Sequence, residues 1–407
     1  MLKISDHLLW SAVGLLLMIS FFAIFSCTFS MQAKVGADAL LFVKKQLFSL
    51  LVGLVGLVAF TYFDYKHLKK FAIPLYTIML LMLFAVLFIR GGAGSAQRWL
   101  QLGPMSFQPS ELAKIFFVIT LAAFFAKREL LTSLSQNILL LIMAGLPFLL
   151  IFKQPDLGTA LVFIVILIGL LSVTNSSTRL LLLLTTPVLS IAFRPLLFLW
   201  FIYLFAVVVT LFLSRALVRD WLLILGVNIS VGIAIPFIWS MLKPYQQNRI
   251  LSFLNPGLDP YGAGYHSLQS KIAIGSGGFF GKGFLHGTQT QLQFIPEQHS
   301  DFIFSVVGEE FGFLGAVLVL GLFGIIIWRA FTIAANSPDR FGSLLAAGIA
   351  VMTAFHVFAN VGMVLGLLPV VGMPLPFVSF GGSSLLMNLI ALGILQNIAM
   401  RREKLIF

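Results

Sequence analysis

LLWSAVGLLLMISFFAIFSCTF, residues 8–29, is a run of 22 residues without a charged side chain. An α-helix needs about 20 apolar residues to cross the hydrocarbon core of a bilayer. The run is longer than the ~7–15 apolar residues of a signal peptide, and no A-x-A-like cleavage site follows it. It therefore predicts a transmembrane helix and not a cleaved signal.

The composition extends this prediction to the whole chain. The 407 residues are 59% hydrophobic and only 10% charged, and the mean hydropathy is +1.04. Soluble domains are about half apolar and about a quarter charged, and a transmembrane β-barrel would show short alternating strands instead. The sequence thus predicts an all-α polytopic protein with one integral membrane domain over 1–407. The single Cys27 excludes an internal disulfide.

Twelve apolar segments are long enough to be membrane crossings. We expect them at 8–29, 45–63, 71–89, 110–126, 136–152, 158–173, 179–193, 195–213, 221–241, 302–328, 341–366 and 378–400. Basic connectors follow alternate crossings, at 64–70, 126–129, 214–220, 329–340 and 401–404. Because Lys and Arg accumulate on the cytoplasmic side, both termini are predicted to be cytoplasmic.

The same bias accounts for the net charge of +12. Nucleic-acid binding is the other reading of such a charge, but no soluble domain carries it, so we expect no nucleic-acid partner. Attraction to anionic lipids or to an anionic substrate is compatible with the membrane reading.

The least regular pair of crossings is 179–213, because its first half is short and Arg194-Pro195 interrupts it. It is predicted to be a helical hairpin, either fully spanning or re-entrant. In the re-entrant case ten full crossings remain.

Three segments then lie outside the cell: 90–109, 152–158 and the large loop 242–301. The large loop mixes aromatic residues, glycines and helix-length patches, which is not the composition of a disordered linker. A fourth segment, 367–377, is apolar and holds three prolines. Irregular backbone at membrane depth must be covered by protein or line a cavity, so we expect this segment to fold back over the centre of the bundle.

The stretch GSGGFFGKG (275–283) resembles a phosphate-binding loop without being one. Ser276 stands where the first glycine of a P-loop is required, and Gly283 stands where Ser or Thr must follow the lysine. The sequence therefore does not predict an ATP-driven pump.

Four loop residues, His286, Glu297, His299 and Asp301, could in principle gather a metal ion. They lack a fixed ligand spacing, so ordinary polar loop residues are the alternative.

Several acids lie at predicted helix ends. Glu111 falls in the first turn after Pro109, and Lys114 lies on the same helix face three residues on. The pair can be a structural ion pair or part of a site. Asp156 can cap the helix that follows it, or serve a site, or both.

Asp301 directly precedes the apolar run FIFSVV at the outer end of the next crossing. Capping is again an alternative. Partial desolvation at such a place raises the pKa of a carboxyl group, however, and a raised pKa suits a general base. Glu309 and Glu310 lie about two turns deeper, and structural roles are expected for them.

Basic residues on the outer side depart from the positive-inside bias. They are Arg90, Arg98, Lys153, Lys243, Arg249, Lys271 and Lys282. Arg and Lys bind phosphate groups, so the residues predict an outward-facing, membrane-level site for an amphipathic and anionic substrate.

Four stretches strongly resemble the SEDS family (shape, elongation, division and sporulation proteins). They are PSELAK (109–114), QPDLGTA (154–160), the run from Tyr265 to Gly315, and GMPLPFVSFGGSS (372–384). They occur in the order of the family, and the similarity covers nearly the whole chain. Within it, KGFLHGTQTQLQFIPEQHSDFIF (282–304) is similar to the RodA, or elongation, branch.

The resemblance implies a peptidoglycan glycosyltransferase. Such proteins polymerise lipid II into glycan strands at the outer face of the bacterial cytoplasmic membrane, beside a class B penicillin-binding protein. The family fold has ten transmembrane helices, whereas this chain has about 65 residues between Thr174 and Trp239 where the family has room for one helix. The hairpin 179–213 is therefore expected to be an insertion.

The resemblance also implies site residues. Asp301 corresponds to the essential acid and is expected to be the general base of an inverting transfer. The expected substrate-binding residues are Glu111, Lys114, Asp156, Trp99, Arg98, Lys271 and His299. Of these, Glu111, Lys114 and Asp156 are expected in a central cavity. Lys114, Arg98 or Lys271 would hold the pyrophosphate, and a divalent cation could assist.

Two other functions fit intramembrane charges. A flippase for lipid II, or another transporter of lipid-linked sugars, would use them along its pathway. A non-catalytic scaffold for cell-wall enzymes would not depend on Asp301.

Overall fold

The structure, a computed structural model, describes residues 6–36, 38–88, 99–102, 105–128, 134–174, 178–214, 217–242, 244–254 and 263–401. The predicted crossings correspond to α1 (His7–Val35), α2 (Leu41–Tyr62), α4 (Ala72–Val86), α5 (Pro109–Ala126), α6 (Leu134–Lys153), α7 (Leu157–Val173), α8 (Thr178–Phe193), α9 (Leu197–Leu213), α10 (Val218–Met241), α15 (Gly312–Ala335), α16 (Arg340–Val364) and α17 (Gly382–Met400). The shorter elements are α3 (Tyr65–Lys70), α11 (Pro244–Leu254), α12 (Ala263–Gly277), α13 (Thr288–Leu292), α14 (Ile303–Glu310), β1 (Leu100–Leu102) and β2 (Met105–Phe107).

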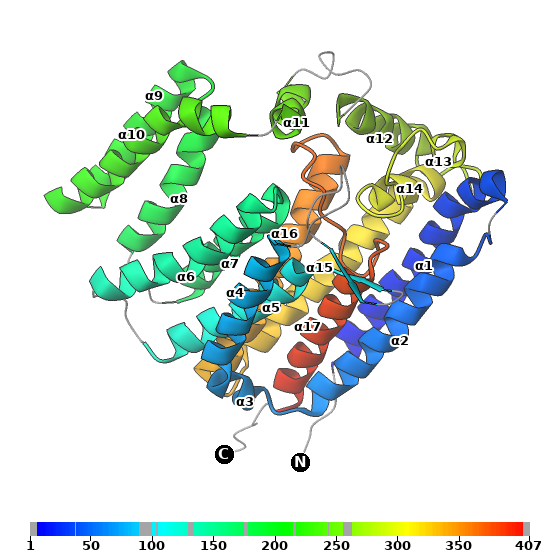
Figure 1. Ribbon diagram of the computed structural model, residues 1–407, viewed down its shortest axis with the longest axis horizontal. Coiled ribbons are helices and arrows are strands. Elements are labelled where there is room, and N and C mark those ends of the chain that lie inside the picture. Colours follow the sequence, from blue (N-terminus) through cyan, green and yellow to red (C-terminus); the bar gives the residue numbers. More distant parts are fainter. Residues whose placement is uncertain are drawn as a thin grey trace.

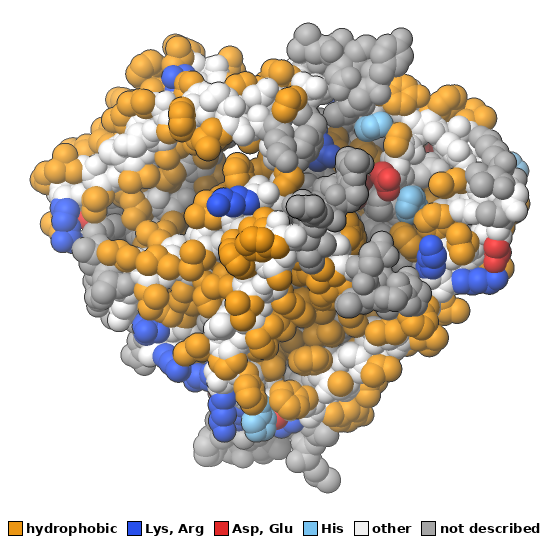
Figure 2. All heavy atoms as spheres, in the orientation of Figure 1, with side chains coloured by type: hydrophobic (Ala, Val, Ile, Leu, Met, Phe, Trp, Pro, Cys, Tyr) orange, Lys and Arg blue, Asp and Glu red, His pale blue; other side chains and the backbone are white. Residues whose placement is uncertain are grey.

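The prediction of an all-α polytopic membrane protein is confirmed. Among the described residues, eight helices are long and apolar enough to cross a membrane, and four shorter apolar helices accompany them. Hydrophobic side chains cover most of the face in Figure 2, while Lys and Arg gather toward the edge near α3. Both termini lie at that same end of the molecule, and α11–α14 lie at the opposite end (Figure 1).

The inner helices of the bundle are α5, α16 and α17. Of the 18-residue apolar stretch of α5, 83% of the residues are buried inside the protein, against 22% for the corresponding stretch of the peripheral α2. Helix α17 packs closely along α2, because Gly393 approaches the Leu57 carbonyl so nearly that a Cβ would lie 2.5 Å from its oxygen. Small residues permit such close approach between membrane helices.

Buried amides and ion pairs join the elements at the end that holds the termini. Asn397 is wholly buried, and its Nδ2 donates to the carbonyls of Phe60, Thr61 and Phe63. Arg329 pairs with Asp6 at 2.5 Å. These contacts join α17 to the end of α2, and α15 to the start of α1.

The prediction of one continuous helix over 302–328 is wrong, because the helix is interrupted between α14 and α15. Gly312 adopts a φ of +67°, and a Cβ there would lie 2.2 Å from the Gly281 nitrogen. The first amides of α15 donate outside the helix, from Phe313 to the Gly278 carbonyl at 2.9 Å. The break between α14 and α15 therefore makes room for the 277–283 turn, which packs against Gly312 and accepts the hydrogen bonds of the first α15 amides.

Two loop regions carry more structure than the sequence indicated. In 90–109, β1 and β2 form an antiparallel hairpin, with Leu100 opposite Phe107. The large loop 242–301 contains α11, α12 and α13, which agrees with the expectation that it is not a linker.

The predicted hairpin corresponds to α8 and α9, which join α10 in a three-helix unit with its own small core. The break at Arg194-Pro195 falls between α8 and α9, as expected. Asn228 on α10 is wholly buried, and its Nδ2 donates to Thr186 Oγ1 at 2.8 Å while its Oδ1 accepts from the Tyr203 hydroxyl at 3.1 Å. Figure 1 shows this unit at the side of the bundle, with α8 next to α7.

After α16 the chain turns into an irregular segment, residues 365–381. The turn is a Schellman motif: Gly366 has a φ of +66°, and Leu367 donates to the Gly362 carbonyl at 2.7 Å. Several side chains of the segment, including Leu375 and Val378, are buried. The expected fold-back of 367–377 is therefore present.

Candidate functional site

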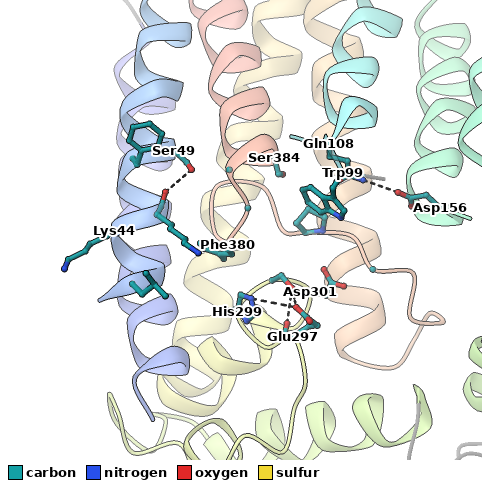
Figure 3. Close-up of a pocket in the computed structure, with 18 of the residues that line it drawn as sticks. Lys44, Ser49, Trp99, Gln108, Asp156, Glu297, His299, Asp301, Phe380 and Ser384 are labelled. Atoms are coloured by element: carbon teal, nitrogen blue, oxygen red, sulfur yellow. Dashed lines mark hydrogen bonds and ion pairs between the residues drawn. The ribbon is translucent and has the colours of Figure 1, made fainter. Parts of the chain in front are cut away.

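A cavity of about 760 Å³ opens near the α11–α14 end of the bundle. Its walls come from segments far apart in the sequence: Leu41, Lys44, Lys45, Phe48, Ser49, Trp99, Gln108, Asp156, Arg249, Glu297, His299, Ser300, Asp301, Gly372, Pro374, Phe380, Gly381, Gly382 and Ser384. Figure 3 shows Asp301, Glu297 and His299 on one wall, and Trp99, Gln108 and Asp156 across from them.

Asp301 is presented by a tight turn just before α14. Glu297 has a φ of +50°, and its carbonyl accepts from the amides of Ser300, Asp301 and Phe302. Phe302 occupies the N-cap position of α14, so Asp301 is not the N-cap residue of this helix. The half-buried Asp301 lies beside Gly372, where a Cβ would be 3.2 Å from Asp301 Oδ2.

On the opposite wall, Asp156 has the capping role that its sequence position indicated. Its Oδ1 accepts from the Thr159 amide at 3.2 Å at the start of α7. Its Oδ2 accepts from Gln108 Nε2, also at 3.2 Å. Trp99 is half exposed on this wall.

Positive charge reaches the cavity from α2 and α11. Lys44, Lys45 and Arg249 are lining residues, and a Cβ at Gly372 would lie 4.0 Å from Arg249 Nη1. The Lys44 ammonium points away from the cavity (Figure 3) and pairs with Asp38 at 2.5 Å. The two lysines were missed as site residues from the sequence. The signal was present, because they begin a crossing at the end where the positive-inside bias expects few cations.

His299 faces the cavity from within an aromatic cluster. Its ring centroid lies 4.9 Å from that of Phe42 and 5.5 Å from that of Phe380. Burial lowers the pKa of His299, and the nearby Glu297 carboxylate opposes this effect. The imidazole is therefore neutral near pH 7 and can accept or donate one hydrogen bond to a ligand.

Glu111 and Lys114 do not line this cavity, in contrast to the expectation for them. They form a buried ion pair, with Lys114 Nζ 2.7 Å from Glu111 Oε1. Lys114 Nζ also lies 2.8 Å from His356 Nε2 on α16. The helical spacing correctly paired the two residues, but it could not show that their face meets α16.

Lys271, another predicted substrate-binding cation, is not among the lining residues either. Lys271 lies on α12 and packs over Gly366, at the end of α16. Arg98 lies outside the described residues.

Both acids that end α14 are buried, and both accept hydrogen bonds. The Glu309 carboxylate accepts from the amides of Gln289 and Thr290, each at 2.9 Å, and from Lys282 Nζ at 3.0 Å. Burial alone would raise the pKa of Glu309, but the hydrogen bonds from Thr290, Gln289 and Lys282 hold it below its ordinary value. Glu309 thus fixes α13, which lies in the HGTQTQL stretch, against α14.

Glu310 is 1% exposed and accepts from the Ser26 hydroxyl on α1. Burial raises its pKa to about 7, and the charge of Glu309 adds to the shift. The carboxyl group is therefore largely protonated below neutral pH.

Replacing Glu310 by glutamine is expected to stabilise the protein at pH 8 but not at pH 4.5. The folded state holds a proton with a pKa of about 7 where the unfolded state has 4.5, so wild-type stability falls as pH rises through this window. A shift of this size corresponds to about 3 kcal/mol. Thermal unfolding in detergent at both pH values measures it, and an equal difference at both would contradict the prediction.

The four loop residues named above as possible metal ligands do not form a cluster. Within the described part of the chain, no group of three or more His, Cys, Asp and Glu side chains has the geometry to hold a metal ion. His286 lies outside the cavity lining, apart from Glu297, His299 and Asp301.

Comparison with known proteins gives one consistent result. The family profile described as "Cell cycle protein", built on FtsW, RodA and SpoVE, matches residues 6–204 and 185–404. The chain is 38% identical over 363 residues to the peptidoglycan glycosyltransferase MrdB of Escherichia coli, covering 89% of this chain and 86% of that protein. It is 35% identical to the peptidoglycan glycosyltransferase RodA of Treponema pallidum, covering 88% and 89%.

Solved structures give the same relationship. A chain from a peptidoglycan synthase complex that coordinates polymerization and crosslinking superposes with a TM-score of 0.70 at 29% identity, covering 98% of this chain and 99% of that chain. The crystal structure of RodA from Thermus thermophilus gives a TM-score of 0.64 at 26% identity, covering 98% of each.

Proposed function

The chain belongs to the family of FtsW, RodA and SpoVE, the SEDS family, and from this premise we propose that it polymerises lipid II into peptidoglycan glycan strands. The curated relatives that carry the name peptidoglycan glycosyltransferase are 38% and 35% identical over most of the chain. The activity proposed is that of the RodA branch, in cell elongation.

The observation that carries the proposal is the cavity itself. It joins one wall of carboxylates, with Asp301 half-buried at its centre, to cations from α2 and α11. A glycosyl transfer from a polyprenyl diphosphate needs a base for the acceptor hydroxyl and positive charge for the leaving group. Both kinds of group line this one space.

In the proposed reaction, Asp301 accepts the proton of the 4-hydroxyl of N-acetylglucosamine. The hydroxyl oxygen then forms a bond to the anomeric carbon of the second saccharide, and the bond from that carbon to the diphosphate oxygen breaks. The electron pair leaves with the diphosphate, and the configuration inverts from α to β. An inverting transfer needs one base and no covalent nucleophile, so a single indispensable acid is sufficient.

The structure favours different cations for the diphosphate than the sequence did. Lys44, Lys45 and Arg249 line the cavity, whereas Lys271 and Lys114 do not. Arginine can bind the diphosphate oxygens with two parallel hydrogen bonds, and lysine acts as a point charge. We therefore assign the leaving-group role to Lys45 and Arg249, because Lys44 Nζ is already paired with Asp38. Trp99, Asp156 and His299 remain as substrate-binding residues.

The proposed setting is the outer leaflet of the bacterial cytoplasmic membrane, with both termini in the cytoplasm. The basic connector that follows α2 forms α3, which lies at the end that holds the termini (Figure 1), and this supports the orientation. A class B penicillin-binding protein is the proposed partner, because a structural neighbour belongs to a complex that couples polymerization to crosslinking. The hairpin of α8 and α9 is proposed to be an insertion relative to the family.

The test is a reconstitution with purified protein, its partner and labelled lipid II. A polymerase converts lipid II added from outside into glycan strands, which gel electrophoresis resolves. A flippase moves lipid II across the liposome membrane and makes no polymer, and that outcome would overturn the proposal. A scaffold would give neither polymer nor transport.

A further inference from the structure

The peptide carbonyls of His299, Ser300 and Asp301 all accept hydrogen bonds from α16 or from the irregular segment 365–381 that follows it. The His299 carbonyl accepts from the Phe380 amide at 2.9 Å. The Ser300 carbonyl accepts from Ser379 Oγ at 2.6 Å, and the Asp301 carbonyl accepts from Asn360 Nδ2 at 2.9 Å. These residues precede α14, so secondary structure alone does not explain the bonds.

We propose that Asn360 and Ser379 are positioning residues that hold the backbone of Asp301 in a fixed place at the wall of the cavity. We call the three hydrogen bonds from Asn360, Ser379 and Phe380 the carbonyl clamp. The inference rests on the proposed role of Asp301 as the base.

The two side chains of the clamp are buried and already engaged. Asn360 is 0% exposed, and its Nδ2 donates to the Met373 carbonyl at 2.7 Å as well as to Asp301. Ser379 is 4% exposed, and its Oγ accepts from the Leu375 amide at 2.8 Å while it donates to Ser300. Loss of either donor therefore removes the hydrogen bond that the Ser300 or Asp301 carbonyl accepts from the protein.

The region that supplies the clamp is itself anchored to other helices. Ser20 on α1 donates to the Val378 carbonyl at 2.7 Å, and Gln46 on α2 donates to the Ser379 carbonyl at 3.3 Å. The clamp thus connects Asp301 to the framework of the bundle. On the other side, the amides of 300–302 donate to the Glu297 carbonyl.

The consequence is kinetic. A base must lie within hydrogen-bond reach of the proton it takes, and a misplacement of about 1 Å can cost ~10²-fold in rate. Loosening the clamp is expected to lower kcat while KM for lipid II changes little, because the cations and aromatic residues that contact the substrate stay in place.

The first test compares two substitutions at one position. Ser379→Ala removes the hydroxyl, and Ser379→Thr keeps it. We expect kcat to fall roughly 10- to 100-fold in Ser379→Ala with KM within about twofold of wild type, and to return toward wild type in Ser379→Thr. Full kcat in Ser379→Ala, beside an active wild type, would overturn the clamp.

The second test uses Asn397 as a matched control, because it is a wholly buried amide that also joins carbonyls, at the far end of α17. Asn360→Leu and Asn397→Leu should both lower thermal stability, but only Asn360→Leu should lower kcat per folded molecule. An equal loss of kcat in both would show that Asn360 acts through stability alone, against the proposal.

A readout independent of activity separates this inference from the proposed function. Hydrogen–deuterium exchange of the peptide around 297–303 should be faster in Ser379→Ala and Asn360→Leu, and unchanged in Ser379→Thr and Asn397→Leu. Unchanged exchange in all four variants would overturn the clamp even if the wild type makes no polymer. An inactive wild type would count against the proposed function alone.

Discussion

Asp301→Asn is expected to lower glycan polymerisation by the purified protein about 10²- to 10⁴-fold, the usual contribution of a general base. Asparagine has nearly the same size as aspartate, but its amide cannot accept the proton of a sugar hydroxyl. The side chain is half-buried and the turn that holds it is formed by main-chain bonds, so the fold should not change. Product length and yield from labelled lipid II measure the loss.

A control on the same turn separates the loss of the Asp301 base from the loss of one negative charge in the cavity. Glu297→Gln removes a carboxylate that lines the same cavity but is exposed, and it leaves Asp301 in place. We expect this variant to slow polymerisation less than Asp301→Asn. If Asp301→Asn gave the wild-type yield with an unchanged melting curve, Asp301 would not be the base.

Lys114→Met is expected to destabilise the protein by roughly 3–5 kcal/mol, because it leaves the buried Glu111 carboxylate without its partner. The side chains of Lys114 and Glu111 are only 4% and 5% exposed, so water cannot compensate. The double variant Glu111→Gln/Lys114→Met removes both charges and should recover much of this loss. Thermal unfolding in detergent compares the three proteins.

The double variant also decides between the two readings of this pair. If the ion pair is only structural, polymerisation per folded molecule returns together with stability. If Lys114 also serves the substrate, as the family resemblance implies, a stable double variant remains inactive. A Lys114→Met protein as stable as wild type would contradict the buried pair itself.

Local patterns were sufficient to predict most helices. The apolar run after Pro109 predicted a crossing at 110–126, and α5 spans Pro109–Ala126. These predictions succeed because length, hydrophobicity and a proline at the first position act within one segment. The acid at the entrance of α14 was found in the same way, from its place directly before an apolar run.

The remaining features depend on contacts between distant segments. The break at Gly312 exists because the 277–283 turn approaches it, and no pattern within 302–328 indicates that approach. Lys44 and Lys45 join the site because α2 packs beside the segment that holds Phe380, more than 330 residues later. Periodicity gives the face of a helix but not the neighbour that the face meets.

The buried amide of Asn228 couples α10 to the hairpin of α8 and α9. Excising residues 179–213 would remove α9 and most of α8, and α10 would keep its direction whether this hairpin spans the membrane or is re-entrant. It would also remove Thr186 and Tyr203, and leave the Asn228 amide with only the Ile224 carbonyl of its own helix. A polar amide left in hydrocarbon costs roughly 2–7 kcal/mol, so a lineage that gains or loses the hairpin must change position 228 with it.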